Sequence, residues 1–159
     1  MDAKTYKVVL IGSGGVGKSA FLEQLKNGFF QRKYITTLGV DVCTIKVKGT
    51  TFEIWDTAGQ EQFSGLGDGY YVNADAAILM FDSTNKLSFK RLEEWKIRFR
   101  NVVGDEVPII TVATKCDIVP AFGFNVNIIK ISTKNNLGLQ KPFIKIMQLL
   151  KTTLDQERD

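Results

Sequence analysis

The sequence predicts an α/β fold in which a mostly parallel sheet is covered by helices on both faces. Short, continuously apolar runs, typical of strands buried on both sides, occur at residues 8–11, 76–81 and 108–113. Segments with helical spacing lie between such runs, and this alternation favours parallel strands joined by right-handed crossovers. Ligands bind such sheets at the carboxyl ends of the strands, and a glycine-rich loop at residues 12–19 directly follows the first run.

The first half of the chain continues with a helix and a hairpin. Residues 20–27 have apolar positions at helical spacing, whereas residues 29–37 show no clear period and are predicted to be a loop. Residues 40–47 alternate as the two faces of a strand do, residues 48–50 form a turn, and residues 51–55 return as the partner strand. This half therefore contributes an antiparallel pair to the sheet.

The second half alternates strands and helices. A helix is predicted over residues 88–103, a strand over 126–131 and a helix over 141–154, with Pro142 near its first turn. Residues 118–125 are few and contain a proline and a glycine, so they leave no room for a helix. We therefore expect two of the later strands to be connected without one.

Length and composition fit one globular domain over residues 1–159, with its core at 7–154. The chain has 159 residues, of which 44% are hydrophobic and 24% charged. Its two cysteines are too few for a disulfide framework or a zinc site. The lysines and arginines, which leave a formal charge of +4, are scattered and form no basic patch interleaved with aromatic residues. No apolar run is long enough to cross a bilayer. We expect a soluble monomer in the cytoplasm or nucleus that binds no nucleic acid.

The glycine-rich loop has the composition of a phosphate-binding loop. Its residues are Gly12, Ser13, Gly14, Gly15, Val16, Gly17, Lys18 and Ser19. Glycines let successive backbone N–H groups face inward, and the start of the following helix adds a positive dipole end, a combination that suits a polyphosphate. Lys18 can reach the terminal phosphates, and the Ser19 hydroxyl can ligate Mg²⁺. The alternative is an ordinary glycine-rich turn.

A second candidate segment is Asp56-Thr57-Ala58-Gly59-Gln60-Glu61. Asp56 stands at a strand end, where it is either a surface turn residue or the carboxylate that holds Mg²⁺ in nucleotide hydrolases, and the residues after it favour the second. Gly59 can bring a backbone N–H close to the γ-phosphate, and Gln60 can orient an attacking water. Gln60, Gly59 and Lys18 are therefore the predicted catalytic group.

With these segments the sequence resembles a small GTPase of the Ras superfamily, whose fold is the P-loop small G domain. The resemblance covers residues 7–154 and includes a switch threonine at Thr37 and base-recognition segments at residues 114–117 and 132–134. Three further stretches are most similar to the Ran branch, with Rab next, and lie at residues 34–40, 60–71 and 141–143.

The resemblance implies how the residues contact a bound GTP or GDP. It makes Thr37 the Mg²⁺ ligand that joins Ser19 and Asp56. It places Phe30 against the guanine and Tyr34 over the phosphates. The other contacts to the nucleotide that it implies, besides the phosphate loop, are made by Ala20, Gly59, Thr114, Lys115, Asp117, Ser132, Thr133 and Lys134.

Asp117 is the candidate for base selectivity, because a carboxylate accepts hydrogen bonds from the guanine N1–H and exocyclic amine, which adenine lacks. From spacing alone, an exposed charged turn remains the alternative. Thr114 replaces the usual Asn of the family, as in Rho-like GTPases, and Thr133 replaces the usual Ala, but its contact is a backbone one. We expect binding to survive both replacements.

The largest departure from the family is the fourth crossover helix, for which there is no room between Asp117 and Ser132. Our hypothesis is that Phe122 and Phe124 lie over the sheet face that this helix would cover, and strong exposure of both rings would exclude it. The sequence also lacks the C-terminal cysteines that carry prenyl groups, so we expect no lipid anchor of that kind.

Three functions remain open. The resemblance implies a Ran-like switch that binds GTP or GDP with Mg²⁺, hydrolyses GTP slowly until a partner activates it, and acts in nucleocytoplasmic transport. Its partners would be effectors, an exchange factor, a GTPase-activating protein and nuclear transport receptors. The first alternative is a Ran-like interaction module that does not hydrolyse GTP, which the missing helix leaves open. The second, an ATP-using P-loop kinase, is disfavoured by Asp117.

Overall fold

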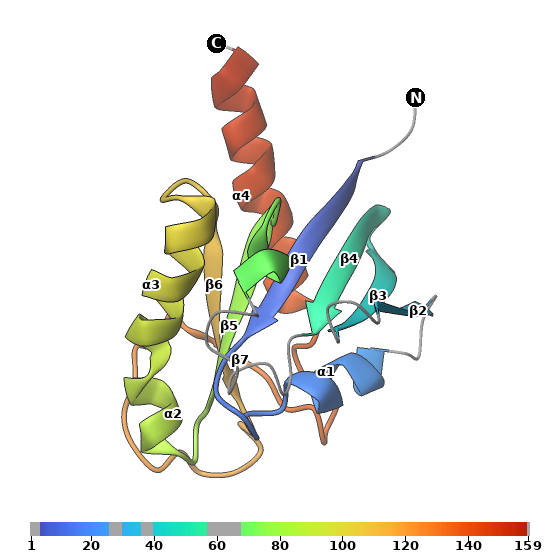
Figure 1. Cartoon of the computed structure of the whole chain (residues 1–159). Helices are drawn as coiled ribbons and strands as arrows, with labels where there is room; N and C mark the ends of the chain where they lie inside the picture. Colours follow the sequence, from blue (N-terminus) through green and yellow to red (C-terminus); the bar gives the residue numbers. More distant parts are fainter. Residues whose placement is uncertain (1–3, 26–29, 36–39, 57–67, 159) are drawn as a thin grey trace.

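The computed structural model of the chain describes residues 4–25, 30–35, 40–56 and 68–158. The described strands form one sheet of seven, in the order β2-β3-β4-β1-β5-β6-β7 (Figure 1). The strands are β1 (Thr5–Ile11), β2 (Phe30–Ile35), β3 (Val40–Val47), β4 (Thr50–Asp56), β5 (Ala76–Asp82), β6 (Ile109–Thr114) and β7 (Ile129–Lys130). The helices are α1 (Lys18–Leu25), the short 3₁₀ helix η2 (Asp68–Tyr71), α2 (Lys86–Lys90), α3 (Leu92–Val103) and α4 (Lys141–Arg158).

Strand direction confirms the predicted mostly parallel sheet. β3 is antiparallel to both of its neighbours, β2 and β4, whereas the pairs β4-β1, β1-β5, β5-β6 and β6-β7 are parallel. The β3-β4 hairpin turns at Lys48 and Gly49, whose φ values of 50° and 83° give the left-handed conformation that two-residue hairpin turns favour. The carboxyl ends of the parallel strands β1, β4, β5 and β6 consequently lie along the same side of the sheet.

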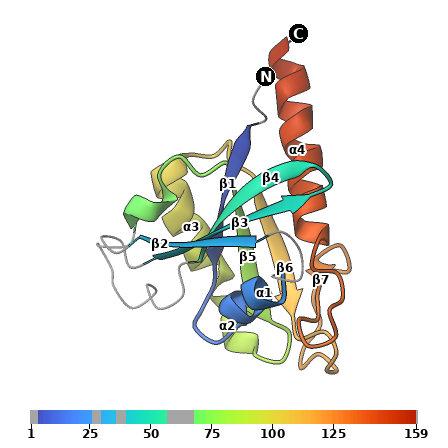
Figure 2. The same ribbon diagram turned by 90° about the vertical axis from the view of Figure 1, so that its right-hand side faces the viewer.

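Helices cover both faces of the sheet, as predicted (Figure 2). On one face α1 and α4 meet through Phe21 and Phe143, whose rings stack with centroids 6.0 Å apart, and Phe52 of β4 lies 5.2 Å from Phe143. On the other face Tyr71 of η2 and Phe99 of α3 pack edge to face at 5.3 Å. Because side chains alternate along a strand, each central strand contributes to both cores.

The prediction of a loop over residues 29–37 is wrong for residues 30–35, which form β2. This strand pairs with β3 in antiparallel register, from Phe30 opposite Ile45 to Ile35 opposite Val40. It is an edge strand, and edge strands commonly carry charged residues that interrupt the apolar alternation. Arg32 and Lys33 are such an interruption, so periodicity could not reveal the strand.

The single helix predicted over residues 88–103 is two helices. α2 begins earlier than predicted because Asn85 caps it, its side-chain oxygen accepting hydrogen bonds from the N–H groups of Leu87 and Ser88. Arg91, with φ −84° and ψ −4°, ends α2 and precedes α3. The Ser88 hydroxyl bonds to the backbone of Asp82 and Asn85, and this contact ties α2 to the end of β5.

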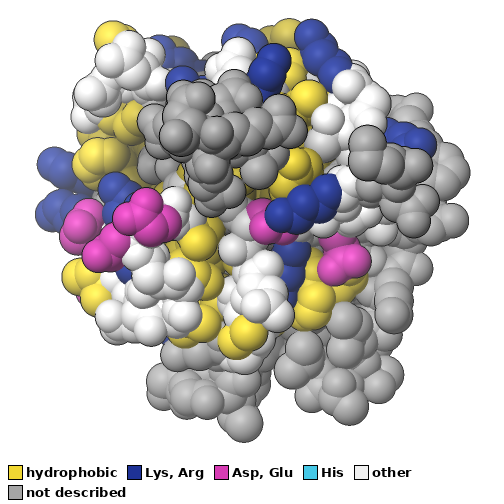
Figure 3. Space-filling model, turned by 90° about the horizontal axis from the view of Figure 1, so that it is seen from above, with side chains coloured by type: hydrophobic (Ala, Val, Ile, Leu, Met, Phe, Trp, Pro, Cys, Tyr) yellow, Lys and Arg dark blue, Asp and Glu magenta, His cyan; other side chains and the backbone are white. Residues whose placement is uncertain are grey.

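Two other boundaries differ from the prediction. The strand expected at residues 126–131 pairs with β6 only at Ile129 and Lys130, because Asn125 accepts hydrogen bonds from Asn127 and Ile128 in a turn just before it. Helix α4 begins at Lys141 as predicted, but it continues beyond residue 154. None of the helices in the described ranges is long and apolar enough to cross a membrane. Seen from above the view of Figure 1, acidic and basic side chains are interspersed with hydrophobic ones (Figure 3).

The predicted absence of a helix after Asp117 is confirmed, since residues 118–128 are all described and consist of turns, bends and irregular chain. The hypothesis for the two phenylalanines is also confirmed in its main point. The rings of Phe122 and Phe124 are half-buried and pack against Phe81 of β5, at 6.1 and 5.2 Å. Phe81 alternates with Leu79, which belongs to the core on the α3 face, so the rings lie on that face.

Truncation of Phe143, which is fully buried between α1 and β4, should destabilise the fold. We expect Phe143→Ala to lower the free energy of unfolding by about 3–5 kcal/mol, because it leaves a cavity in the core. Urea unfolding followed by circular dichroism measures the change. Leu137→Ala, at a side chain that is 59% exposed, is the matched control and should change stability by less than about 0.5 kcal/mol. Equal stability of the two variants would contradict the described core.

Candidate functional site

The glycine-rich loop passes close to the end of β5, and Gly12 makes this passage possible. A Cβ atom at Gly12 would lie 2.4 Å from the carbonyl oxygen of Met80, and its φ of 153° is one that other residues rarely adopt. Gly14, in contrast, has open space where a Cβ would stand. Only at Gly12, therefore, does contact with the neighbouring strand demand a glycine here.

The side chains of Lys18 and Ser19 at the start of α1 point to the loop and to β4. The Lys18 ammonium group is buried and donates to the carbonyl oxygens of Gly12 and, at 3.1 Å, of Ser13. The Ser19 hydroxyl donates to a carboxylate oxygen of Asp56 at 2.9 Å. Two of the three predicted Mg²⁺ ligands are therefore adjacent, and oxygen ligands of this kind suit Mg²⁺.

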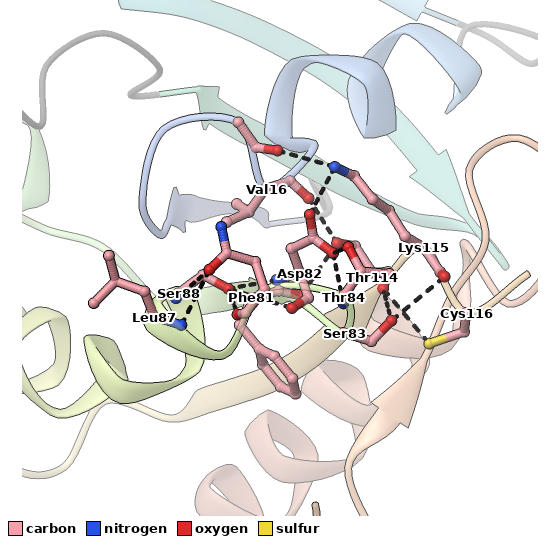
Figure 4. A network of polar contacts seen from close by, with 12 residues as sticks. Val16, Phe81, Asp82, Ser83, Thr84, Leu87, Ser88, Thr114, Lys115 and Cys116 are labelled. Atoms are coloured by element: carbon pink, nitrogen blue, oxygen red, sulfur yellow. Dashed lines mark hydrogen bonds and ion pairs between the residues drawn. The ribbon is translucent and has the colours of Figure 1, made fainter. Parts of the chain in front are cut away.

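Thr114 connects the loop to the central strands. Its hydroxyl lies 2.6 Å from the carbonyl oxygen of Val16 and 3.1 Å from that of Phe81, and its residue is 2% exposed. One hydroxyl proton is thus shared between the phosphate loop and the end of β5 (Figure 4). A threonine in place of the family's usual asparagine supplies a buried tether here.

Lys115 extends across the end of β5 toward the loop. Its ammonium group forms an ion pair with the carboxylate of Asp82 at 2.7 Å and a hydrogen bond with the carbonyl oxygen of Gly15 at 3.3 Å. Its φ of 59° is a left-handed conformation that costs a non-glycine residue about 1–2 kcal/mol. Such local strain clusters at functional sites, where surrounding contacts impose it.

Asp82 is the acidic partner that sequence reasoning missed. Burial by itself would raise the pKa of its carboxyl, but hydrogen bonds from Lys115 and from the hydroxyl and N–H of Thr84, with the charge of Lys115, outweigh burial and lower the pKa. The sequence could have indicated Asp82 by its position: it directly follows the apolar run of β5, at the same kind of strand end as Asp56.

Asp117 is held by the segment that follows β7. The Ser132 hydroxyl donates to a carboxylate oxygen of Asp117 at 2.8 Å and accepts from the N–H of Asn135 at 3.1 Å. Ser132 is itself fixed by a β-bridge to Leu137. Asp117 is an exposed residue, and Ser132 therefore holds its carboxylate through one of the two oxygens.

One pocket of about 360 Å³ joins three of the sequence segments predicted to bind nucleotide. These are the phosphate loop with α1, the segment after β6 and the segment after β7. The residues that line the pocket are Val16, Gly17, Ala20, Thr114, Lys115, Asp117, Ile118, Thr133 and Lys134. Eight of these nine, all but Ile118, are among the residues that the sequence predicted to contact nucleotide.

A comparison with protein-family models extends this agreement to nearly the whole chain. The model described as the Ras family matches residues 7–152. The chain belongs to the Ras family. Proteins of this family are small GTPases, which bind GTP and GDP, typically with Mg²⁺, and work with regulators and effectors. GTPase chemistry with guanine nucleotide is therefore the general function to which this site belongs.

Some predicted site residues of this Ras-family chain have no described side chain. Thr37, Gly59 and Gln60 lie outside the described residues, and Phe30 and Tyr34 are placed only as backbone positions of β2. One contact that the sequence did not indicate joins α3 to the phosphate loop. The indole N–H of Trp95 lies 3.4 Å from the Ser13 hydroxyl. Trp95 is also partly buried against the core on the α3 face.

The ion pair of Asp82 predicts an acid-sensitive contribution to stability. Because its pKa is lower in the folded state than its unfolded value of about 3.9, the carboxylate stabilises the fold above that pH, and this contribution is lost as the pH falls through the folded-state pKa. We expect Asp82→Asn to lower the unfolding free energy at pH 7 by about 1–3 kcal/mol. Below about pH 4, stability should fall less steeply in Asp82→Asn than in the wild type. Urea unfolding between about pH 3 and 7 measures both effects.

Asp105→Asn is the matched control, because Asp105 is an exposed residue in the loop after α3. Its pH profile of stability should follow that of the wild type. If Asp82→Asn also followed it, the ion pair would have no energetic role.

Proposed function

We propose that this chain is a Ran-like guanine nucleotide switch of the Ras family, which binds GTP and GDP with Mg²⁺ and hydrolyses GTP slowly. The observation that carries the proposal is the pocket in which the phosphate loop, Lys115, Asp117 and Thr133 meet. Its volume of about 360 Å³ is adequate for part of a nucleotide. The phosphate loop with α1, the segment after β6 and the segment after β7 each contribute lining residues. We infer action in nucleocytoplasmic transport, in the cytoplasm or nucleus, from the Ran-like stretches at residues 34–40, 60–71 and 141–143.

Base selectivity follows from the chemistry of Asp117. Its carboxylate accepts hydrogen bonds from the N1–H and the exocyclic amine of guanine, and the bond from Ser132 orients it for this. Adenine offers no donor at either place, so ATP would desolvate the carboxylate without supplying the hydrogen bonds that guanine supplies. This argument disfavours the ATP-using kinase. Lys115 lines the same pocket, and its stem is held between Asp82 and the loop, where it can lie along the base and ribose.

Hydrolysis requires the residues around the γ-phosphate. Lys18 is placed in the phosphate loop, where its ammonium group can exchange the loop carbonyls for phosphate oxygens. Ser19, Asp56 and Thr37 would hold Mg²⁺, which neutralises charge on the β- and γ-phosphates when bound. Gln60 orients water but is no strong base, so hydrolysis without a partner is slow, and an arginine supplied by an activating protein accelerates it.

Partner proteins can distinguish the GTP-bound from the GDP-bound state, because a bound γ-phosphate orders the segments that contact it. We propose effectors, an exchange factor, a GTPase-activating protein and nuclear transport receptors as these partners. The alternative proposal is an interaction module that keeps the Ran-like surface and does not hydrolyse GTP. The absence of a helix between Asp117 and β7, a stretch that the structure describes throughout, is the observation that favours it, because the region around the base site departs there from the family pattern.

The nucleotide bound by the purified protein tests the base site. We expect stoichiometric GDP or GTP after denaturation, exchangeable for guanine nucleotides and not for ATP. Asp117→Asn should lose at least about 100-fold in affinity for GDP and gain affinity for xanthosine diphosphate, because an amide can donate to the carbonyl that replaces the guanine amine. Asp105→Asn should keep the wild-type preference. An empty wild-type protein that exchanges no guanine nucleotide would refute the proposal.

Gln60→Leu separates the switch from the module that does not hydrolyse GTP. We expect single-turnover GTP hydrolysis to slow at least about tenfold, because the attacking water loses its orienting group, while GDP affinity stays unchanged. Gln140→Leu, at an exposed glutamine before α4, should hydrolyse GTP at the wild-type rate. Identical rates for wild type and Gln60→Leu, with GTP still bound, would favour the interaction module.

A further inference from the structure

We propose that Phe122 and Phe124 are positioning residues for guanine recognition: packed on Phe81 and Phe89, their rings hold the segment that carries Lys115 and Asp117. The inference rests on the proposed function, since it concerns the same base site. In this inference, two aromatic side chains support the base-recognition segment at the place where residues 118–128 form no helix.

The four rings form a connected cluster on the α3 face of the sheet. Phe81 at the end of β5 contacts Phe89 of α2 at 5.1 Å, Phe124 at 5.2 Å and Phe122 at 6.1 Å. Phe122 also contacts Phe89 at 5.2 Å and Phe124 at 5.9 Å. The ammonium group of Lys130 lies 5.6 Å from the centre of the Phe124 ring and adds a contact from β7.

Backbone and hydroxyl bonds connect this cluster to the base-recognition segment. The N–H of Ala121, next to Phe122, donates to the carbonyl oxygen of Ser83 at 3.0 Å. The hydroxyl and N–H of Ser83 donate in turn to the carbonyl oxygen of Thr114, at 2.7 and 3.2 Å. Figure 4 shows Ser83, Thr114 and Lys115 meeting there. The chain after Asp117 is thus anchored to the same strand end that tethers Lys115.

A second connection runs through Phe81 itself. Its carbonyl oxygen receives the Thr114 hydroxyl, while its ring is the centre of the cluster. The next residue, Asp82, pairs with Lys115, and the Ser88 hydroxyl beside Phe89 bonds to the Asp82 backbone. A movement of the rings would therefore shift the Phe81 carbonyl oxygen, which holds Thr114, and the Asp82 carboxylate, which holds Lys115.

The segment needs this support because, between Ile118 and Ile128, the described backbone hydrogen bonds other than that of Ala121 to Ser83 are local. The N–H of Ile118 bonds to the carbonyl oxygen of Lys115, and that of Ile128 to Asn125, both within single turns. Fixing the backbone of each residue costs about 1–2 kcal/mol of conformational entropy, which turns of this kind do not offset. Burial and mutual packing of the two aromatic rings supply the missing stabilisation. They keep Asp117 where the Ser132 hydroxyl meets it.

The test compares GDP with inosine diphosphate, which lacks the exocyclic amine that donates to Asp117. For the double variant Phe122→Ala/Phe124→Ala we expect the GDP dissociation constant to rise about fivefold to tenfold and the inosine diphosphate constant to rise less. The ratio of the two constants should therefore move toward one. Phe122→Leu/Phe124→Leu, which keeps large apolar side chains, should restore most of the discrimination. Competition against a fluorescent GDP analogue, with each variant made in the whole 159-residue chain, measures all of these constants.

Phe52→Leu is the matched control, because Phe52 is fully buried on the opposite face and packs against Phe143. We expect it to lower the melting temperature while leaving the ratio for GDP and inosine diphosphate at the wild-type value. A general loss of stability would move the melting temperature in both variants and the ratio in neither. An unchanged ratio in the double variant would accordingly overturn the proposal.

Two further outcomes are distinguishable. If wild-type protein bound neither nucleotide, or bound both equally, the proposed function would fail and this inference with it. If the double alanine variant did not fold, Phe124→Ala alone would carry the test, since it removes the ring that lies 5.2 Å from Phe81 and leaves Phe122 in place. In that single variant the ratio should still shift toward one, and a wild-type ratio would overturn the positioning role.

Discussion

The candidate site depends on one buried hydroxyl, that of Thr114. It reaches the carbonyl oxygens of Val16 and Phe81, so three segments that end or follow parallel strands are held at one point. A hydrogen bond buried in this way has no water to replace either partner, and its loss would leave carbonyl groups unsatisfied. The phosphate loop, the end of β5 and the base-recognition segment are consequently joined through this one hydroxyl.

At these strand ends, the strained backbone of Lys115 is accompanied by an ion pair between its side chain and Asp82. Lys115 has a left-handed backbone and an ammonium group paired with Asp82, and its side chain crosses to the carbonyl oxygen of Gly15. Asp82 is in turn fixed by Thr84 and its backbone by Ser88. The contacts that hold the Lys115 side chain therefore come from β5 and the phosphate loop, whereas the bond to the Asp117 carboxylate comes from Ser132. The two side chains of the base site thus have separate hydrogen-bond partners.

The sequence correctly predicted the elements that are apolar throughout or whose apolar residues recur with a regular period. β1, β5 and β6 were recognised as apolar runs because both faces of each are covered by helices. β2 was missed because an edge strand needs no apolar alternation, and the division between α2 and α3 was missed because Asn85 caps a helix whose start depends on contacts with β5. The phenylalanines after Asp117 were predicted to lie on the sheet, and they do, but their partners Phe81 and Phe89 were not predicted.

What the sequence by itself determined is the local chemistry: a glycine, Gly12, where the loop approaches Met80, a lysine and a serine at the start of α1, and carboxylates at strand ends. These follow from backbone conformation and residue type within a few positions. Only the tertiary structure decided which distant residues pair, because Lys115 meets Asp82, and Thr114 meets Val16, through the order of strands β1, β5 and β6 in the sheet. Strand order arises from packing both faces of the sheet at once, and no local pattern encodes it.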